Sequence, residues 1–385
     1  MIPLGELVDI KGGGTPDKSN SEYWNGEIPW ASVKDFKKNT LDSTLDSITL
    51  LGAKNSATNV IPAGNIIIPT RMALGKVAIN TIDLAINQDL KALSIKDNNV
   101  VDRDYLFRWL ESQSSLIESE GKGATVKGIT LPFLKGLNVP IPPLNEQKRI
   151  AAIFEKVDSI RQKCNRGVKL ADDFLRATFL EMFGDPVANP KRWDVASLLE
   201  YGSFKNGMNF TKGESGSVLK CLGVGNFKSL ATITCMDNID EIELNTIPSD
   251  DYLLKDGDIV FVRSNGNKAL VGRCLTIYPN KEKVTFSGFC IRYRIEKSAI
   301  TAEYLNFLFR TPSMKRQMLS GGQGANIQNI SQGTLSALRI PVPPLEKQQT
   351  FSKIVSFHSE LMKKLNINIV ETNDMFGSIS QTYFN

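Results

Sequence analysis

The chain has 385 residues, of which 41% are hydrophobic and 23% are charged, and it carries a net charge of +5. These values are typical of a soluble globular protein with room for two or three domains, and the modest positive charge permits a polyanionic partner without requiring one. No apolar run approaches the roughly 18 residues of a membrane helix, and the N-terminal segment lacks the features of a secretory signal. We therefore expect a cytoplasmic protein.

The cysteine and histidine content argues against a zinc site or an imidazole-based catalytic centre. There is one histidine, His358, and no two cysteines form a C-x-x-C pair. An ordinary zinc site needs several such ligands at short spacings. We interpret the scattered cysteines as buried and reduced: Cys164, Cys221, Cys235, Cys274 and Cys290.

Residues 1–142 alternate short β-branched runs with Gly, Asn, Asp and Pro. We predict strands at 65–69 and 76–80, within a mainly antiparallel sheet. A Gly-rich run at 11–16 lacks the spacing of a phosphate-binding loop and is typical of a turn. The final strand ends at a proline-rich segment, 140–143, which cannot donate to a sheet but is tolerated in the first turn of a helix.

A long helix is predicted over residues 143–184. Gly184, followed by Asp185 and Pro186, is a typical helix end, because glycine readily adopts the left-handed conformation found there and proline cannot continue the helix. Apolar spacing near 3.5, sustained over several heptads, favours coiled-coil pairing. The stripe is interrupted by Arg161 and consists of Ile150, Phe154, Val157, Cys164, Val168, Ala171, Leu175, Thr178 and Met182.

The second half of the chain repeats this order. Residues 123–153 align without a gap on 324–354, and 11 of the 31 positions are identical. An ungapped match of this extent indicates a tandem duplication with a large repeat unit. Further strands are predicted at 258–262, 274–278 and 289–295, and the second long helix is predicted over 344–385.

The predicted fold is α+β, with an internal pseudo-twofold repeat. Two similar, mainly antiparallel-β recognition domains, 1–142 and 185–343, alternate with the two helices, which pair as an antiparallel coiled coil. At 1.5 Å per residue each helix reaches about 60 Å, so the domains are expected at opposite ends of a rod. The alternative is two ordinary domains, each with its helix folded back on its own sheet.

Three pairs of loops carry residue types that suit the reading of DNA: 70–76 with 263–273, 121–129 with 321–330, and 32–38 with 223–229. Arg and Lys bind guanine in the major groove, and Asn or Gln pairs with adenine. The same loops also fit an alternative interpretation as solvated turns. The candidates are Lys34, Lys37, Arg71, Lys76, Lys122, Thr125 and Lys127 in the first copy, and Asn226, Arg263, Ser264, Asn265, Lys268, Gln323, Asn326 and Gln328 in the second.

Signatures of catalysis are weak throughout the sequence. It contains neither a G-x-x-x-x-G-K-[ST] loop nor a G-x-G-x-x-G motif after a strand, and the Asn-Pro-Pro-aromatic signature of an amino-methyltransferase is absent. Asp17, Asp35 and Lys37 loosely match a metal-dependent nuclease pattern, but the second copy has no counterpart. We expect no catalytic residue, no metal and no bound cofactor in this chain.

Several motifs in this order resemble those of the specificity subunits of type I restriction–modification enzymes. They are "GGGTPDKSNSEYWNGEIPWASVKDF" near the start, "IPIPPLNEQKRIAAIF" and "IPVPPLEKQ" before the helices, and "GDIVFVRS" in the second half. The resemblance covers the whole chain. One departure is that residue 1 already lies inside the first recognition domain, so we expect the ring of repeats to be permuted.

The resemblance implies a non-catalytic subunit that binds double-stranded DNA. Each recognition domain would read one half of a bipartite asymmetric site, and the helices would set the spacer and dock two methyltransferase subunits. S-adenosylmethionine, ATP and Mg²⁺ would then belong to the methyltransferase and motor-nuclease partner subunits. The competing hypothesis is a non-catalytic protein-binding scaffold that oligomerises through its coiled coil.

Overall fold

The computed structural model describes residues 1–123, 127–210, 215–227, 231–320 and 329–384. The chain divides into two compact units. The first unit contains residues 1–165 and 366–385, and the second contains residues 166–365. Each unit therefore combines one β-rich region with parts of both long helices. Among the described residues, no helix is both long enough and apolar enough to span a membrane.

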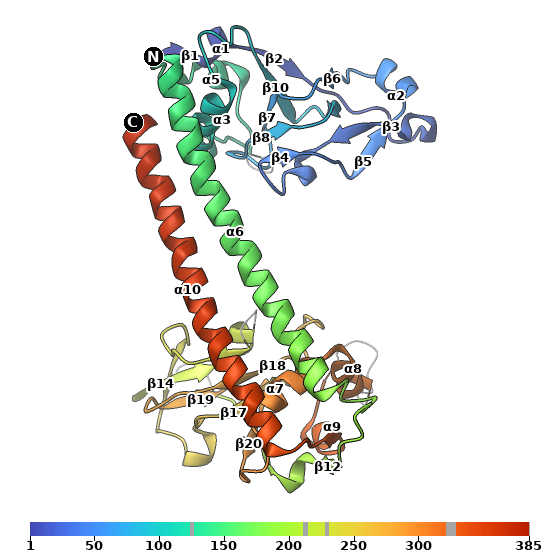
Figure 1. The fold of residues 1–385 in the computed structure, drawn as a ribbon, viewed down its shortest axis with the longest axis vertical. Helices are drawn as coiled ribbons and strands as arrows, with labels where there is room; N and C mark the ends of the chain where they lie inside the picture. The colour runs from blue at the N-terminus through green and yellow to red at the C-terminus, as the bar shows by residue number, and fades with distance from the viewer. Residues whose placement is uncertain (124–126, 211–214, 228–230, 321–328, 385) are drawn as a thin grey trace. The chain divides into compact units, whose positions relative to one another are not determined.

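The first unit is built on two main sheets (Figure 1). One has the order β2-β10-β7-β8-β4 and is antiparallel except at β4, which pairs in parallel with β8. The other has the order β5-β3-β9-β6, with β3 and β9 parallel. The bounds of these strands are β2 Val8–Gly12, β3 Trp24–Ala31, β4 Thr40–Leu41, β5 Asp46–Ile48, β6 Val60–Ile61, β7 Ile66–Pro69, β8 Ala78–Asn80, β9 Leu84–Ile86 and β10 Leu90–Ile95.

The second unit repeats the larger sheet with the same pattern. Its order is β13-β20-β17-β18-β15, and the edge strand β15 is again parallel to its neighbour. A three-stranded sheet, β16-β14-β19, lies beside it. The bounds are β13 Gly202–Asn206, β14 Ser217–Leu222, β15 Thr232–Ile233, β16 Glu241–Leu244, β17 Asp258–Val262, β18 Cys274–Ile277, β19 Val284–Phe286 and β20 Cys290–Ile295. The predicted repeat and its strands are confirmed.

Short helices and one small two-stranded pairing complete each unit. In the first unit these are β1 Ile2–Pro3 with β11 Asn138–Val139, and helices α1 Leu4–Leu7, α2 Leu50–Lys54, α3 Arg103–Ser112, α4 Ser114–Ser119 and α5 Leu131–Gly136. In the second they are β12 Val195–Ser197 with β21 Arg339–Pro341, and helices α7 Ala302–Arg310, α8 Pro312–Ser320 and α9 Gln332–Ser336. Single 3-10 turns are η1 Ser21–Tyr23, η2 Val33–Asp35, η3 Leu198–Glu200, η4 Val224–Phe227 and η5 Asp250–Tyr252.

The repeated proline motif anchors each long helix to its unit. Gln147, three residues into α6 (Leu144–Phe183), is fully buried; it accepts a hydrogen bond from the Asp102 N–H at 2.8 Å and donates to the Pro142 carbonyl at 2.8 Å. The Tyr105 hydroxyl donates to the Pro140 carbonyl at 2.8 Å. The prolines thus connect the last strand, the N-terminus of α3 and the start of the long helix.

The same contacts recur in the second unit. Gln348, at the start of α10 (Leu345–Phe384), is also fully buried; it accepts from the Thr301 N–H at 2.9 Å and donates to the Pro343 carbonyl at 2.7 Å. The Tyr304 hydroxyl donates to the Pro341 carbonyl at 2.7 Å. The shared spacing of the two copies therefore reflects equivalent hydrogen bonds.

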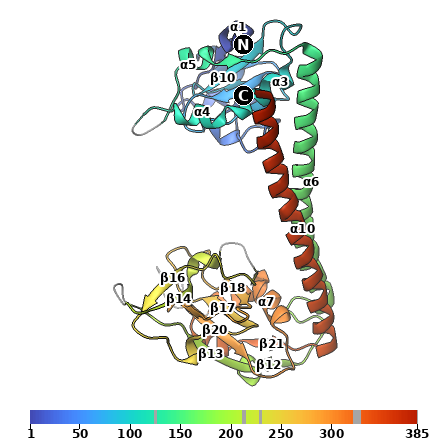
Figure 2. The ribbon, with the colours of Figure 1, turned by 90° about the vertical axis from the view of Figure 1, so that its left-hand side faces the viewer.

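In the first unit, the beginning of α6 pairs with the end of α10 (Figures 1 and 2). Phe154 stacks on Phe384 at 5.4 Å between ring centroids and meets Phe376 edge-on at 4.9 Å. Arg149 donates to the Tyr383 hydroxyl at 2.9 Å. Phe384 also contacts the Tyr105 ring of α3, so the end of the chain completes the core of the unit that contains its beginning.

In the second unit, the end of α6 pairs with the beginning of α10. Phe351 meets Phe179 at 5.4 Å and Phe183 at 5.5 Å between ring centroids. His358 lies 3.3 Å from Asp172, further along the same pair. Residue numbers rise along one helix as they fall along the other, so the pairing is antiparallel, as predicted. Gly184 ends α6 in the left-handed conformation, with φ of +78°.

Candidate nucleic-acid interface

Two of the predicted loops of the first unit lie side by side after β7. The Ile129 N–H donates to the Thr70 carbonyl at 2.9 Å, and the Met72 N–H donates to the Lys127 carbonyl at 3.1 Å. Lys122 and Gly128 exchange backbone hydrogen bonds at 3.0 Å. The structure thereby brings together three exposed cations that the sequence analysis selected: Arg71, Lys122 and Lys127.

The third predicted loop, residues 32–38, is held beside the loop after β7. The Lys76 ammonium of that loop donates to the Phe36 carbonyl at 3.0 Å, next to the turn η2. Within that turn the Ser32 N–H donates to the Asp35 carboxylate at 2.8 Å, and the Ser32 hydroxyl accepts from the Lys34 N–H at 3.3 Å. A capped turn of this kind holds the backbone in place and leaves the Lys34 side chain exposed.

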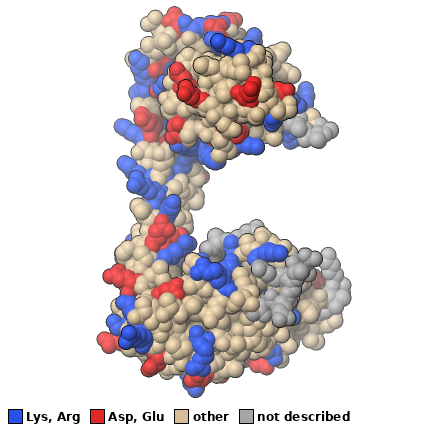
Figure 3. Space-filling view, turned by 90° about the vertical axis from the view of Figure 1, so that its right-hand side faces the viewer, with Lys and Arg blue, Asp and Glu red and all other residues tan. Residues whose placement is uncertain are grey.

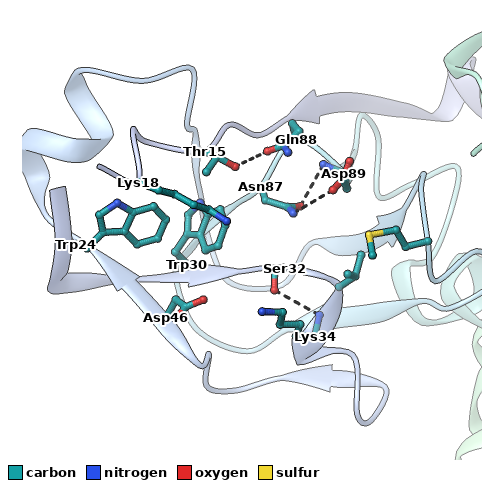
Figure 4. Close-up of a pocket in the computed structure, with 12 residues that line it drawn as sticks. Thr15, Lys18, Trp24, Trp30, Ser32, Lys34, Asp46, Asn87, Gln88 and Asp89 are labelled. Carbon is teal, nitrogen blue, oxygen red and sulfur yellow. Dashed lines mark hydrogen bonds between the residues drawn. The ribbon is translucent and has the colours of Figure 1, made fainter. Parts of the chain in front are cut away.

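Beside these loops the surface of the first unit is hollowed into an open cavity of about 510 Å³ (Figure 4). Trp24 and Trp30 form one wall, with their rings edge to face at 5.1 Å. The indole N–H of Trp30 donates to the Gly14 carbonyl at 3.0 Å, so this wall is fixed. The lining residues are Thr15, Lys18, Trp24, Trp30, Ser32, Val33, Lys34, Asp46, Met72, Asn87, Gln88 and Asp89.

The turn between β9 and β10 lies at this cavity and was not selected from the sequence. The Asp89 carbonyl accepts the Thr70 N–H at 2.8 Å, and its carboxylate lies 3.8 Å from the Arg71 guanidinium. Asn87 accepts the Asp89 N–H at 3.1 Å, and Gln88 accepts a hydrogen bond from the Thr15 hydroxyl. The sequence feature that could have revealed this turn is the polar triplet Asn-Gln-Asp between two buried strands. Such a triplet resembles an ordinary turn.

Lys37 and Lys76 line another cavity of the first unit, with a volume of about 330 Å³. Lys38 and Arg161 also line it, so its edge is rich in cations. Burial raises the pKa of the nearby Glu111 carboxyl, and the positive charge of Arg108 opposes that rise. Of the predicted contacts, Lys34 therefore lines the first cavity, while Lys37 and Lys76 line the second, whose lining also includes Phe376 of α10.

The second unit has the same loop frame with different side chains. The Arg263 N–H donates to the Phe289 carbonyl at 2.8 Å, and the Ile330 N–H donates to the Arg263 carbonyl at 3.0 Å. Ser264 forms an isolated β-bridge with Asn329. By these contacts Arg263 occupies the position of Thr70. Ser264 corresponds to Arg71, and Phe289 corresponds to Asp89.

The third loop of the second unit is also held by a cation. The Arg273 guanidinium donates to the Phe227 carbonyl at 3.1 Å, as Lys76 does to Phe36 in the first unit. Asn226, a predicted DNA contact, accepts the Gly223 N–H at 2.9 Å and donates to a backbone carbonyl at 3.2 Å. Its amide therefore holds its own turn in place.

Two further candidates of the second unit, Asn265 and Lys268, lie in the loop that follows β17. Asn265 accepts the Asn267 N–H at 2.7 Å, and Lys268 is exposed. Burial lowers the pKa of the Lys315 amine, and the positive charge of Arg273 lowers it further. Both cations donate to the Ala269 carbonyl, Arg273 at 3.2 Å and Lys315 at 3.1 Å, so two positive charges lie together beside this loop. Figure 3 shows Lys and Arg side chains gathered on the surface of this unit.

Four predicted contacts lie outside the described residues: Thr125, Gln323, Asn326 and Gln328.

The weak nuclease pattern of Asp17, Asp35 and Lys37 has a local structural explanation. The Asp35 carboxylate accepts backbone N–H groups from Ser32 and Leu45, and Asp17 accepts from Ser19. Within the described part of the chain there is no group of three or more Cys, His, Asp and Glu side chains arranged to hold a metal.

The chain matches the family model of the type I restriction modification DNA specificity domain over residues 1–170 and 204–371. It is 37% identical over 172 residues to the specificity subunit of the type I restriction enzyme EcoR124I/EcoR124II of Escherichia coli, covering 43% of this chain and 42% of that one. It is 22% identical over 388 residues to the MjaIX specificity subunit of Methanocaldococcus jannaschii, covering 93% and 88% respectively.

Solved structures share the fold over nearly the whole chain. The S subunit of a type I restriction–modification system from M. genitalium superposes with a TM-score of 0.56 at 16% identity, covering 98% of this chain and 93% of that one. A structure concerned with the assembly and conformational transition of the type I R-M system gives 0.61 at 17% identity, covering 100% and 97%. The predicted α+β fold with paired long helices is confirmed.

The twin β-rich units, the paired helices and the family match define the class. The chain belongs to the specificity subunits of type I restriction–modification systems. The sequence resemblance is confirmed, as is the expectation of a DNA specificity subunit that is not itself catalytic.

Proposed function

We propose that each unit of this chain reads one half of a bipartite, asymmetric DNA site. The observation that supports the proposal most strongly is that the loops of the two units share the same backbone hydrogen bonds but carry different side chains. Thr70 and Arg263 make the same backbone hydrogen bonds, yet one side chain is a short hydroxyl and the other a guanidinium. An equivalent frame with different donors and acceptors suits two readers of different base sequences.

The candidate contacts divide by the chemistry of their side chains. Arg71, Arg263 and Ser264 lie on the loops after β7 and β17, where their side chains suit base edges in a major groove. Lys37 and Lys76 line the cation-rich cavity and suit the phosphate backbone. Base contacts would set the sequence preference, and phosphate contacts would supply much of the affinity and its dependence on salt.

We propose further that the helix pair sets the unread spacer and docks the methyltransferase subunits. Both helices leave large apolar side chains exposed, which is typical of a protein interface. On the first unit these include Ile160, Ile367, Val370 and Met375, and on the second Leu170, Phe174, Leu180 and Phe357. S-adenosylmethionine, ATP and Mg²⁺ would be bound by the partner subunits.

Mapping of methylated adenines tests the proposal. DNA from cells that carry this subunit with its methyltransferase partner should be methylated at one asymmetric motif, with two specified parts and a spacer of fixed length.

A salt titration of the purified complex separates DNA reading from the scaffold hypothesis. Affinity for the site should fall steeply with salt, because each neutralised phosphate releases counterions. Absence of a methylated motif together with salt-independent partner binding would support the scaffold.

A further inference from the structure

A large aromatic side chain of the second unit is exposed beside the loop that follows β17. Phe289, in the turn between β19 and β20, is 60% exposed. Its neighbours along the chain are buried, since Phe286 and Cys290 are both inaccessible to solvent. Single exposed apolar side chains are common on protein surfaces, so exposure alone does not make Phe289 a candidate contact. Its place in the loop frame does, because its backbone carbonyl accepts the Arg263 N–H.

The backbone that carries this ring is held on both sides. The Phe289 carbonyl accepts the Arg263 N–H at 2.8 Å, and the Phe289 N–H donates to the Ser287 hydroxyl at 3.3 Å. The Cys290 N–H donates to the Ser287 carbonyl at 2.8 Å, which closes the turn. The ring therefore extends from a fixed backbone, so binding need not order the turn that carries it.

The surroundings of Phe289 are mainly polar, although Met208 forms an isolated β-bridge with Ser287 and Phe210, two residues after Met208, is 41% exposed. Next to it in the turn are Ser287 and Gly288, and across the hydrogen bond lie Arg263 and Ser264. A protein-docking patch would present several apolar side chains together. A ring among hydrogen-bonding groups suits a ligand that is polar at its edges and carries a small apolar group.

The first unit places a different group at the equivalent position. Asp89 lies where Phe289 lies, and its carboxylate is 3.8 Å from the Arg71 guanidinium. A carboxylate and a phenyl ring favour different base-pair edges, because a carboxylate accepts hydrogen bonds and a ring makes only apolar contacts. This position therefore differs between the units in the way expected of a residue that determines specificity.

We propose that Phe289 contacts the 5-methyl group of a thymine in the half-site read by the second unit. This inference rests on the proposed function. The thymine methyl is the apolar group that a base pair presents in the major groove, and Phe is among the side chains that contact it. Uracil forms the same base pair without the methyl group, so it isolates this single contact.

The test uses the complex with its methyltransferase subunits and a duplex carrying the mapped site. Each thymine of the second half-site is replaced singly by uracil, and Kd is measured for the wild type and for Phe289→Ala. One replacement should weaken wild-type binding roughly fourfold, the value expected for one buried methyl group. The same replacement should leave the affinity of Phe289→Ala unchanged. Phe289→Leu, which keeps an apolar side chain, should retain most of the penalty.

Leu199→Ala is the matched control. Leu199 is 59% exposed, and it precedes β13, whose Gly202 pairs with Ile295 at the end of β20 remote from Phe289. This variant should show the full uracil penalty, and uracil in the first half-site should affect all four proteins equally. Because Phe289 is exposed, its replacement should leave thermal unfolding unchanged.

The outcomes separate the two proposals. A wild-type complex without preference for any bipartite site would overturn the proposed function and this inference with it. If the site preference holds but Phe289→Ala keeps the wild-type penalty at every thymine, the methyl contact alone is overturned. The methyl contact is also overturned if no uracil replacement in the second half-site weakens binding by the wild type.

Discussion

Gln147 and Gln348 make equivalent hydrogen bonds at the starts of the two long helices. Each side chain is fully buried, accepts a backbone N–H at 2.8 or 2.9 Å near the start of a short helix, and donates to a proline carbonyl at 2.8 or 2.7 Å. The identical Gln in the two proline motifs therefore has a structural explanation, which is independent of DNA.

Replacing Gln348 by Ala should destabilise the second unit by about 2–4 kcal/mol, because the change leaves several buried backbone groups without their hydrogen-bond partner. Urea unfolding measures the effect. Gln349→Ala is the control, since the Gln349 side chain is exposed and its loss should change stability little. Equal stability of the two variants would show that the buried amide does not anchor the helix.

Phe384→Ala should destabilise the first unit, although residue 384 lies at the opposite end of the sequence from most of that unit. The ring packs on Phe154 and Tyr105, and losing a buried Phe costs about 3–5 kcal/mol. Hydrogen exchange should therefore speed up in β2, β7 and β10, with the exposed Gln381→Ala as the control. Faster exchange confined to the second unit would contradict the observed division of the core.

Thiol reactivity should separate Cys235 from the buried cysteines. Burial raises the pKa values of Cys221, Cys274 and Cys290 to about 12, so these thiols stay protonated at pH 8 and react slowly with iodoacetamide. Cys235 is exposed, which corrects the expectation that all five cysteines are buried, and it should be the cysteine that is alkylated in the folded protein. Mass spectrometry of the labelled chain measures this, and Cys235→Ser should abolish the rapid labelling.

The same thiols give stability a definite pH dependence. Their ordinary pKa is 9.0, so the unfolded chain loses these protons near pH 9 while the folded chain keeps them until about pH 12. The unfolded state is then favoured increasingly as pH rises through this window. The free energy of unfolding should fall above pH 9, and the fall should be smaller in Cys274→Ala, measured relative to its own value at pH 7.

The helices should act as a ruler if they set the spacer. Removing one heptad from each of 150–183 and 351–384 keeps the apolar stripe in register and shortens each helix by about 10 Å at 1.5 Å per residue. On DNA that corresponds to about 3 base pairs at 3.4 Å each. Methylation mapping should find the same two half-sites with a shorter spacer. An unchanged spacer in an active, folded variant would mean that the helices do not fix the distance.

Much of the fold follows from local sequence patterns. Strand β7 is a continuous apolar run and β17 is apolar after Asp258, and helix α6 ends at the predicted glycine. The contribution of α10 to the core of the first unit was not predictable from spacing alone. The apolar stripe predicts that a helix has a partner, but it does not indicate which short helix, here α3, packs against Phe384.

The candidate site was predicted less completely than the fold. Composition selects loops rich in Arg, Lys and Asn, but it cannot distinguish a free amide from one that holds its own turn, as Asn226 does. The turns at 87–89 and 287–289 were missed because polar turn residues are common, and an exposed Phe is recognised only once burial is known. Equivalence between Asp89 and Phe289 depends on backbone hydrogen bonds that the sequence does not display.

The central claim is that each unit reads its own half-site, and a domain exchange tests it most directly. Residues 186–340 are replaced by the corresponding segment of another specificity subunit, and methylated adenines are mapped in cells that carry the chimera with the methyltransferase partner. We predict that one half of the methylated motif changes to that of the donor while the other half stays the same. A motif in which both halves change, or in which neither does, would contradict the claim.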